Sequence, residues 1–212
     1  MTVSRRCLGV AGVLLLALAL VTARDAAAGP PSDQLRTQID RVLKLLDNPG
    51  LKKDGQARER RAAVRKIADD IFDFGETAKR SLGPHWAART PAEREQFVGL
   101  FSDLLERSFI SKIELYGGEK MQYIGDTIEG DLATVRSMLA TRQATEIPIE
   151  YRMLRKGDRW LVYDVVIEGV SLISSYRTQF NKIIQTSSYT ELVNKMKSKQ
   201  EEFEAELDAK RT

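Results

Sequence analysis

The chain has 212 residues, with 33 basic and 30 acidic side chains, one histidine and one cysteine. This near balance of charge gives no basic surplus of the kind that nucleic-acid-binding proteins use, so we expect no nucleic-acid partner. A single His85 and a single Cys7 also argue against a zinc site, which needs several such ligands, and we expect no metal and no cofactor.

Residues 1–28 have the order of a secretory signal peptide. Met1–Arg6 carries two arginines and no acid, Leu8–Val21 is a 14-residue apolar run, and Ala26–Ala28 offers a small-residue cleavage site. As a helix the run would span only about 21 Å, which is less than the ~30 Å core of a bilayer. We therefore expect cleavage and export to the periplasm. The pair Arg5-Arg6 leaves the twin-arginine route open beside the general secretory route.

Cleavage leaves residues 29–212 as the mature chain, and this part contains no cysteine because Cys7 lies in the leader. Cleavage of the signal peptide also removes three arginines and one acid, so the net charge of the mature chain is close to zero. We expect one domain that is large enough to bury a core and is held by packing without disulfides. The last predicted helix ends in a tail of Lys, Glu and Gln, and we expect about residues 200–212 to be frayed.

Helical spacing of apolar residues governs the first half of the chain. It predicts helices over Gln34–Leu46 and Arg58–Phe74 and, after an interruption at Gly75, a short helix over Glu76–Leu82. Thr90–Glu93 then reads as a capping box with proline at the first helical position. The helix that follows should run to about residue 115 and end at two glycines. Its wide apolar stripe consists of Phe97, Leu100, Phe101, Leu104, Leu105 and Phe109.

From residue 119 the apolar period changes to two, which predicts strands. Four strands are expected, over Met121–Ile128, Leu132–Thr141, Glu146–Arg155 and Arg159–Glu168, with tight turns that make two antiparallel hairpins. The third strand has one apolar and one charged face. The fourth is apolar on both faces, with Trp160, Val162 and Val166 on one and Leu161, Tyr163, Val165 and Ile167 on the other, so we expect it to be central or covered on both sides.

An amphipathic helix over Val170–Ile184 and a last helix from Ser187-Ser188 to about Leu207 complete the pattern. Helices, then an antiparallel sheet, then helices indicate the α+β class, with the C-terminal helices packed over one face of a four-stranded sheet.

Few residues carry the marks of catalysis. His85 has no evident partner, and the acids of Asp69, Asp70 and Asp73 sit beside basic residues on a charged helix, where a solvated ion-paired face is expected. Asp164 lies in the apolar fourth strand, so a tuned acid or base and a structural partner for an arginine are both open. The sequence therefore does not indicate a set of catalytic residues.

The remaining feature is a surplus of apolar side chains on the long helix and the sheet. These side chains fit a closed core, and they equally fit two walls that stand apart around a lipid.

The segment Trp160–Arg177, a strand that turns at Glu168-Gly169 into a helix, resembles the signature of the MlaC-type family of periplasmic lipid carriers, also described as toluene-tolerance or ABC-transporter auxiliary proteins. Other matching residues, in the same order and spacing, are Phe72-Asp73-Phe74, Leu82-Gly83 with Trp86, Thr90-Pro91 leading to Phe97 and Phe101, Ile147–Tyr151, and Gln179-Phe180. The resemblance spans about residues 34–205.

The resemblance implies a non-enzymatic carrier that holds phospholipid in an apolar cavity between sheet and helices. Its implied partners are an inner-membrane ABC transporter complex with a membrane-anchored substrate-binding subunit, and an outer-membrane lipoprotein complex, in a system that maintains outer-membrane lipid asymmetry. We predict as cavity lining Phe101, Leu104, Leu105, Ile149, Tyr151, Val162, Val166 and Tyr176.

Three alternatives stay open. The chain could carry another lipid such as a hopanoid, it could be a small α+β cavity enzyme that uses Asp164 or His85, or it could be a lipid-free adaptor with a closed core. Arg177 could meet a phosphate at the mouth or pair with an acid.

Overall fold

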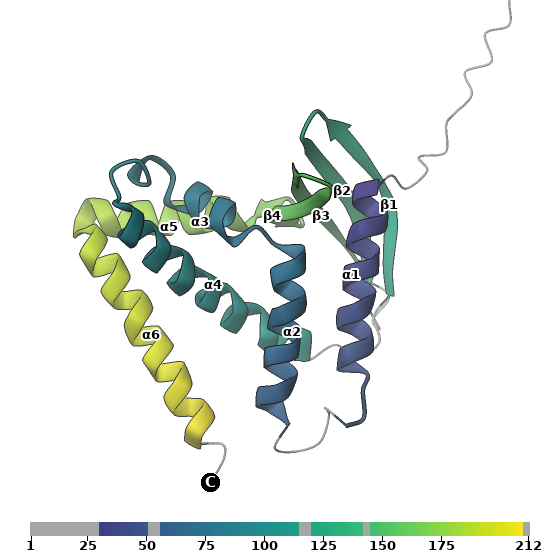
Figure 1. The fold of residues 1–212 in the computed structure, drawn as a ribbon, viewed down its shortest axis with the longest axis horizontal. Coiled ribbons are helices and arrows are strands. Elements are labelled where there is room, and N and C mark those ends of the chain that lie inside the picture. The colour runs from purple at the N-terminus through teal and green to yellow at the C-terminus, as the bar shows by residue number, and fades with distance from the viewer. Residues whose placement is uncertain (1–29, 51–55, 115–119, 142–144, 210–212) are drawn as a thin grey trace, which may run out of the picture.

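The computed structural model describes residues 30–50, 56–114, 120–141 and 145–209; the signal peptide and the two glycines expected after the long helix lie outside this part. The order of elements is helix, sheet, helix (Figure 1). The helices are α1 (Pro30–Leu46), α2 (Ala57–Ile71), α3 (Phe74–Leu82), α4 (Pro91–Glu114), α5 (Leu172–Thr186) and α6 (Tyr189–Ala209), with a 3-10 turn at Gly83–His85. Within the described ranges, no helix has the length and apolar character needed to cross a bilayer.

One antiparallel sheet contains β1 (Lys120–Glu129), β2 (Leu132–Ala140), β3 (Glu146–Lys156), β4 (Arg159–Ile167) and the two-residue β5 (Val170–Ser171), in that spatial order. The α+β class and the four expected strands are confirmed, and β5 is an addition that the sequence did not predict. β4 is not central. Its outer edge is covered by β5 and by a bridge from Phe72, while β1 forms the opposite edge.

The break between α2 and α3 lies at Phe72-Asp73, earlier than the Gly75 interruption that the sequence predicted. The Asp73 N–H donates to the carbonyl of Val162 at 2.9 Å, so the chain leaves α2 to pair with β4. The Asp73 side chain then accepts from the Glu76 N–H and caps α3. A non-local pairing therefore sets this boundary, and a capping aspartate starts the next helix.

Two bulges change the register of the sheet. In β1 the pairing with β2 shifts between Tyr123 and Gly125. In β4, Val162 pairs with Met153 and Asp164 with Arg152, so Tyr163 is the extra residue. Because registered pairs share a face of the sheet, Val162 and Val166 lie on opposite faces. The prediction that Trp160, Val162 and Val166 share one face is therefore wrong, although the burial of β4 on both faces is confirmed.

Two large apolar cores result, beside a small cluster of Leu46 and Val64 between α1 and α2. The sheet-side core joins one face of the sheet to α1 and α2, and it consists of Leu35, Ile67, Ile71, Ala133, Val135, Ile149, Tyr151, Met153, Trp160 and Val162. The helical core joins α3, α4, α5 and α6, and it consists of Ala78, Leu82, Phe97, Leu100, Phe101, Leu105, Ile173, Phe180, Leu192, Val193 and Met196.

The predicted packing of C-terminal helices on the sheet holds for α5, which contacts β4. The sheet-side core lies under α1 and α2, and α6 packs on α4 and α5, away from β1 (Figure 1). The reason lies in the apolar stripe of α4: its buried phenylalanines need partners, and α5 and α6 supply them.

The long helix α4 begins as the sequence predicted. Thr90 Oγ1 accepts from the Glu93 N–H at 3.2 Å, and Glu93 Oε2 accepts from the Thr90 N–H at 2.8 Å, which is the expected capping box.

The helix α6 continues to Ala209, past residue 200, from which fraying is predicted. Gln200 Nε2 donates to Asp103 Oδ2 at 2.7 Å, and the guanidinium groups of Arg61 and Arg107 lie over the Phe203 ring. These contacts hold the end of α6 against α2 and α4.

Candidate functional site

The structure divides the eight predicted cavity residues into separate groups. Phe101 and Leu105 belong to the helical core, with Leu104 and Tyr176 at its margin. Ile149, Tyr151 and Val162 belong to the sheet-side core. Val166 is buried on the other face of the sheet because of the bulge at Tyr163. The eight residues are therefore buried or half-buried, and they are distributed over two cores and the other face of the sheet. Their role as cavity lining stays a prediction.

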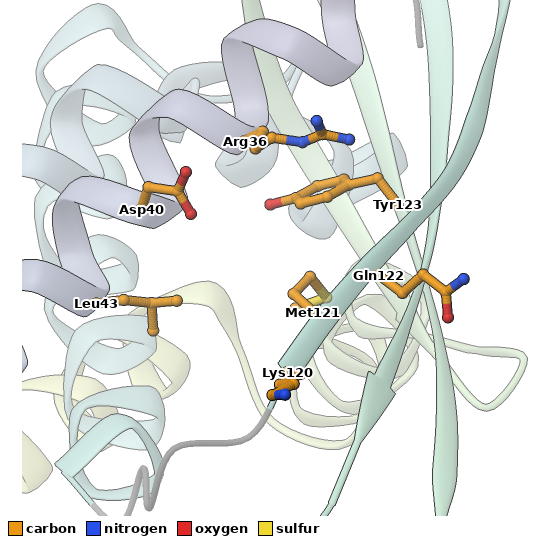
Figure 2. A pocket seen from close by; sticks show the side chains of 7 residues that line it. All are labelled: Arg36, Asp40, Leu43, Lys120, Met121, Gln122 and Tyr123. Atoms are coloured by element: carbon orange, nitrogen blue, oxygen red, sulfur yellow. The ribbon is translucent and has the colours of Figure 1, made fainter. Parts of the chain in front are cut away.

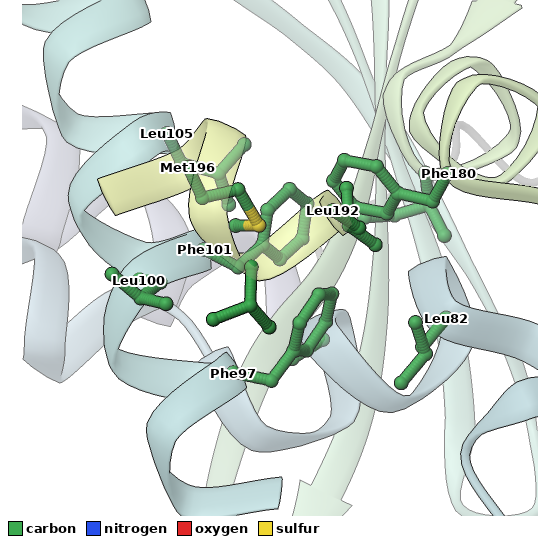
Figure 3. Close-up of a cluster of buried hydrophobic side chains, with 11 residues drawn as sticks. Leu82, Phe97, Leu100, Phe101, Leu105, Phe180, Leu192 and Met196 are labelled. Atoms are coloured by element: carbon green, nitrogen blue, oxygen red, sulfur yellow. The ribbon is translucent and has the colours of Figure 1, made fainter. Parts of the chain in front are cut away.

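The helical core is packed through aromatic rings (Figure 3). The ring of Phe101 meets Tyr176 edge-on at 5.0 Å and Phe180 at 5.3 Å, and Phe97 meets Phe180 at 5.7 Å. Edge-to-face pairs at these distances add attraction to the apolar burial. This group has the contacts of a closed core.

The sheet-side core has a polar spot on its otherwise apolar strand face. Tyr151 is buried, and burial raises its pKa to about 12, against the opposing effect of a hydrogen bond with Ser137. Ser137 Oγ also donates to the carbonyl of Ile149 at 3.2 Å, and Tyr123 of β1 is the registered neighbour of Ser137. Three hydroxyl-bearing residues thus lie together on this face.

A pocket of about 500 Å³ lies beside this spot, between α1 and β1 (Figure 2). It is lined by Arg36, Asp40 and Leu43 of α1 and by Lys120–Tyr123 of β1. Met121 and Tyr123 also pack against the sheet-side core, so the pocket borders that core. Its volume falls within the usual ~300–1,000 Å³ of ligand pockets.

The sequence prediction missed this pocket. A signal was present, since Arg36, Asp40 and Leu43 follow one another at three- and four-residue spacing and Met121 and Tyr123 alternate. These patterns place each set on one face of its element. The contact between the two elements, however, is not local in sequence.

Asp164 is a structural residue. It is 5% exposed; its Oδ2 accepts from Ser171 Oγ at 2.7 Å and from Arg152 at 3.2 Å, and its Oδ1 accepts from the Ile173 N–H at 3.1 Å. Ser171 in turn caps α5 by accepting from the Ser174 N–H. The carboxylate therefore fastens the start of α5 to the sheet, and its acceptor sites are occupied.

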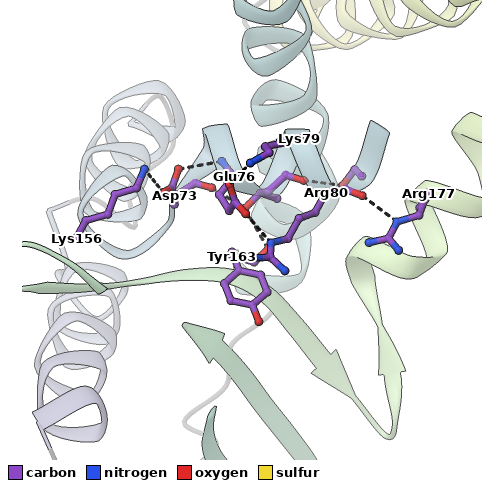
Figure 4. Close-up of polar contacts among 9 residues, drawn as sticks. Asp73, Glu76, Lys79, Arg80, Lys156, Tyr163 and Arg177 are labelled. Atoms are coloured by element: carbon purple, nitrogen blue, oxygen red, sulfur yellow. Dashed lines mark hydrogen bonds and ion pairs between the residues drawn. The ribbon is translucent and has the colours of Figure 1, made fainter. Parts of the chain in front are cut away.

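Among the described residues, no acid forms an ion pair with Arg177, and its contact with a phosphate stays a prediction. Its Nε donates to the carbonyl of Arg80 at 2.8 Å, at the end of α3 (Figure 4). Gly83, just beyond, has φ +57°, and a Cβ there would lie 3.3 Å from Arg177 Cδ. Arg177 thus satisfies a carbonyl that a helix end leaves free, and glycine leaves room for it.

The remaining acid–base candidates are engaged in structure. His85 Nε2 lies 2.8 Å from Asn181 Oδ1. Asp73 pairs with Lys156 and caps α3 (Figure 4). Among the described residues, no three His, Cys, Asp or Glu side chains converge in a way that could hold a metal ion.

Comparison with known proteins places the chain among relatives of known type. The intermembrane phospholipid transport system binding protein MlaC of Haemophilus influenzae is 24% identical over 141 residues, which is 64% of this chain and 66%, just under two thirds, of that protein. The phospholipid-binding protein of Ralstonia solanacearum, solved in complex with a phospholipid at 1.53 Å, has the same fold, with a TM-score of 0.71 and 23% identity over 79% of this chain and 95% of that one. The family model described as MlaC protein matches residues 36–198, and the chain belongs to this family.

Proposed function

We propose that this chain is the phospholipid-binding component of an intermembrane transport system, and that it acts as a carrier and not as an enzyme. The observation that carries the proposal is the fold shared with a protein that was solved with phospholipid bound. Membership of the MlaC family supports it.

The physical need for a carrier follows from the ligand. A diacyl lipid has on the order of 30 methylenes, each costing ~0.8 kcal/mol to expose to water, so roughly 25 kcal/mol opposes its free passage between membranes. A carrier must cover the acyl chains, and it can leave the head group near water.

We place the acyl chains against the sheet-side core, where Ile149, Tyr151 and Val162 pack against α1 and α2. The pocket of about 500 Å³ leads to this core, and two full chains need more space, so α1 and α2 move away from the strands on loading. Phe101, Leu104, Leu105 and Tyr176 form a second patch that a long chain would reach. Val166, on the other face, has no part in this proposal.

We propose that the chain works in the periplasm after removal of residues 1–28. Its partners there are an inner-membrane ABC transporter complex with a membrane-anchored substrate-binding subunit, and an outer-membrane lipoprotein complex. The periplasmic assignment is supported by the order of charged, apolar and small residues at the N-terminus.

Native mass spectrometry of the mature chain, purified without detergent from a Gram-negative host, tests the proposal. The expected result is a folded protein with extra mass that extracts as diacyl phospholipid. A protein that stays free of lipid, both after purification and after incubation with phospholipid vesicles, would refute it. Extraction of a hopanoid instead would assign a different cargo.

A further inference from the structure

The pocket between α1 and β1 contains an unused hydrogen-bond donor. The Tyr123 hydroxyl is buried and has no hydrogen-bond partner in the described part of the chain. Burial, followed by the nearby phenol of Tyr151 and the carboxylate of Asp40, raises the pKa of Tyr123, so the phenol keeps its proton. Because a buried polar group without a partner is costly, this donor indicates a ligand with an acceptor oxygen.

Charged side chains surround this donor without partners of their own. The guanidinium of Arg36 lies over the Tyr123 ring at 4.9 Å, and Lys120 lines the same pocket. Figure 2 shows the Tyr123 hydroxyl directed toward α1, between the level of Arg36 and that of Lys120. Across residues 30–50 and 120–141, neither of these cations takes part in an ion pair or hydrogen bond.

Asp40 provides the opposite charge at the same mouth. It lies one helical turn after Arg36, and no ion pair within the described ranges joins the two. One guanidinium, a phenol donor and one carboxylate therefore line a single pocket, with Lys120 at its end, and the apolar side chains of Leu43 and Met121 complete its walls.

We propose that this pocket binds the head group of a zwitterionic phospholipid of the phosphoethanolamine type. The phosphate oxygens accept from Arg36 and the Tyr123 hydroxyl, and the ammonium group is held by Asp40. The glycerol and the first methylenes lie against Met121, from which the acyl chains enter the sheet-side core. This inference rests on the proposed phospholipid-carrying function, and it adds a head-group site to it.

The test uses the mature chain, stripped of lipid by refolding, and measures loading from vesicles by native mass spectrometry. The probes are dioleoyl phosphatidylethanolamine, dioleoyl phosphatidylglycerol and dioleoylglycerol, the last of which has no phosphate. Glycerophosphoethanolamine, which has the head group without acyl chains, is added as a competitor. Tyr123→Phe removes only the hydroxyl, and Tyr163→Phe is its control, since Tyr163 also lies under an arginine but outside the pocket. Lys44→Ala, an exposed site on α1, is the control for Arg36→Ala.

The expected result is phosphatidylethanolamine loaded in preference to dioleoylglycerol, with affinity about tenfold lower in Tyr123→Phe and in Arg36→Ala and unchanged in both controls. Asp40→Asn should remove the preference for phosphatidylethanolamine over phosphatidylglycerol, and glycerophosphoethanolamine should compete at high concentration. If the wild type loads phospholipid and the Tyr123 and Arg36 variants load it equally, or if dioleoylglycerol loads as well as phosphatidylethanolamine, the head-group site is wrong while the carrier function stands. If the wild type loads none of the lipids, the carrier function itself is wrong.

Discussion

Replacement of Asp164 by alanine separates a structural carboxylate from a catalytic one. The carboxylate accepts from a hydroxyl, a backbone N–H and a guanidinium while being 5% exposed. Each hydrogen bond to a charged acceptor contributes ~1.5–3 kcal/mol. The Arg152 side chain is 42% exposed and can return to water, so its pairing adds only ~0–1 kcal/mol. We expect Asp164→Ala to lower the free energy of unfolding by about 3 kcal/mol, mainly through the contacts to Ser171 and Ile173.

Thermal unfolding followed by circular dichroism measures this loss. For a chain of this size, 1 kcal/mol corresponds to ~2–4 °C, so Asp164→Ala should lower Tm by roughly 6–12 °C. Asp164→Asn keeps one acceptor oxygen and should lie between the variant and the wild type. Asp131→Ala is the control, because Asp131 pairs with Arg155 at the surface and its side chain is 72% exposed; its Tm should stay within ~3 °C.

A measurement of bound lipid distinguishes a structural role of Asp164 from a functional one. Every folded Asp164→Ala molecule should carry as much lipid as the wild type at a temperature well below its Tm. If the Tm of Asp164→Ala lies within 2 °C of the wild-type Tm, the structural assignment is refuted. A loss of lipid at that unchanged Tm would point to a role in binding.

Three further predictions follow from local geometry. Gly83→Ala should lower the free energy of unfolding by ~1–3 kcal/mol, because residue 83 has a positive φ and an added Cβ would meet Arg177. Gly99→Ala, in open space on α4, should raise it by ~0.5–1 kcal/mol. Urea titration measures both changes, and changes of the same sign would contradict this prediction. Burial raises the pKa of Glu106 above 4.5, so stability from this group is full at lower pH and is lost as pH rises through the raised pKa. Glu106→Gln should remove that loss, which a pH series of urea midpoints for both proteins would detect as a changing difference. Ile149→Trp should lower lipid occupancy by filling the sheet-side core, while Ile128→Trp, at an exposed site on β1, should not; equal occupancy by mass spectrometry would remove Ile149 from the lipid site.

The helices and strands were predictable where the signal is local. The capping box at Thr90 and Glu93 fixed the start of α4, and Ser188 caps α6 by accepting from the Glu191 N–H, as expected. Period-two alternation located the four long strands to within one or two residues. These patterns depend only on neighbours in the chain.

The errors arose where distant segments decide the structure. The alternation through β4 looks regular, but the extra residue at Tyr163 depends on pairing with β3, and the Tyr163 carbonyl accepts from Thr77 Oγ1 of α3. This bulge separated Val162 from Val166. The end of α2 was likewise set by the bond between Asp73 and β4.

The candidate site was the least predictable part. Apolar residues at helical or strand spacing identify what is buried, but they do not tell which of two cores receives a side chain. Phe101 and Ile149 were predicted to line the same cavity from facing walls, and they lie in different cores. The pocket between α1 and β1 involves charged residues, which a search for an apolar cavity passes over.

The two edges of the sheet have a consequence for association between copies of the chain. Open strand edges invite pairing between copies and aggregation. Here the outer edge of β4 is covered by Phe72 and β5, and the edge strand β1 is interrupted by its bulge before Gly125 and begins and ends with the charged Lys120 and Glu129. The edges of the sheet therefore resist assembly of several copies into larger sheets. Deleting the bulged residue would straighten β1, and this should increase aggregation of the protein without changing what it binds.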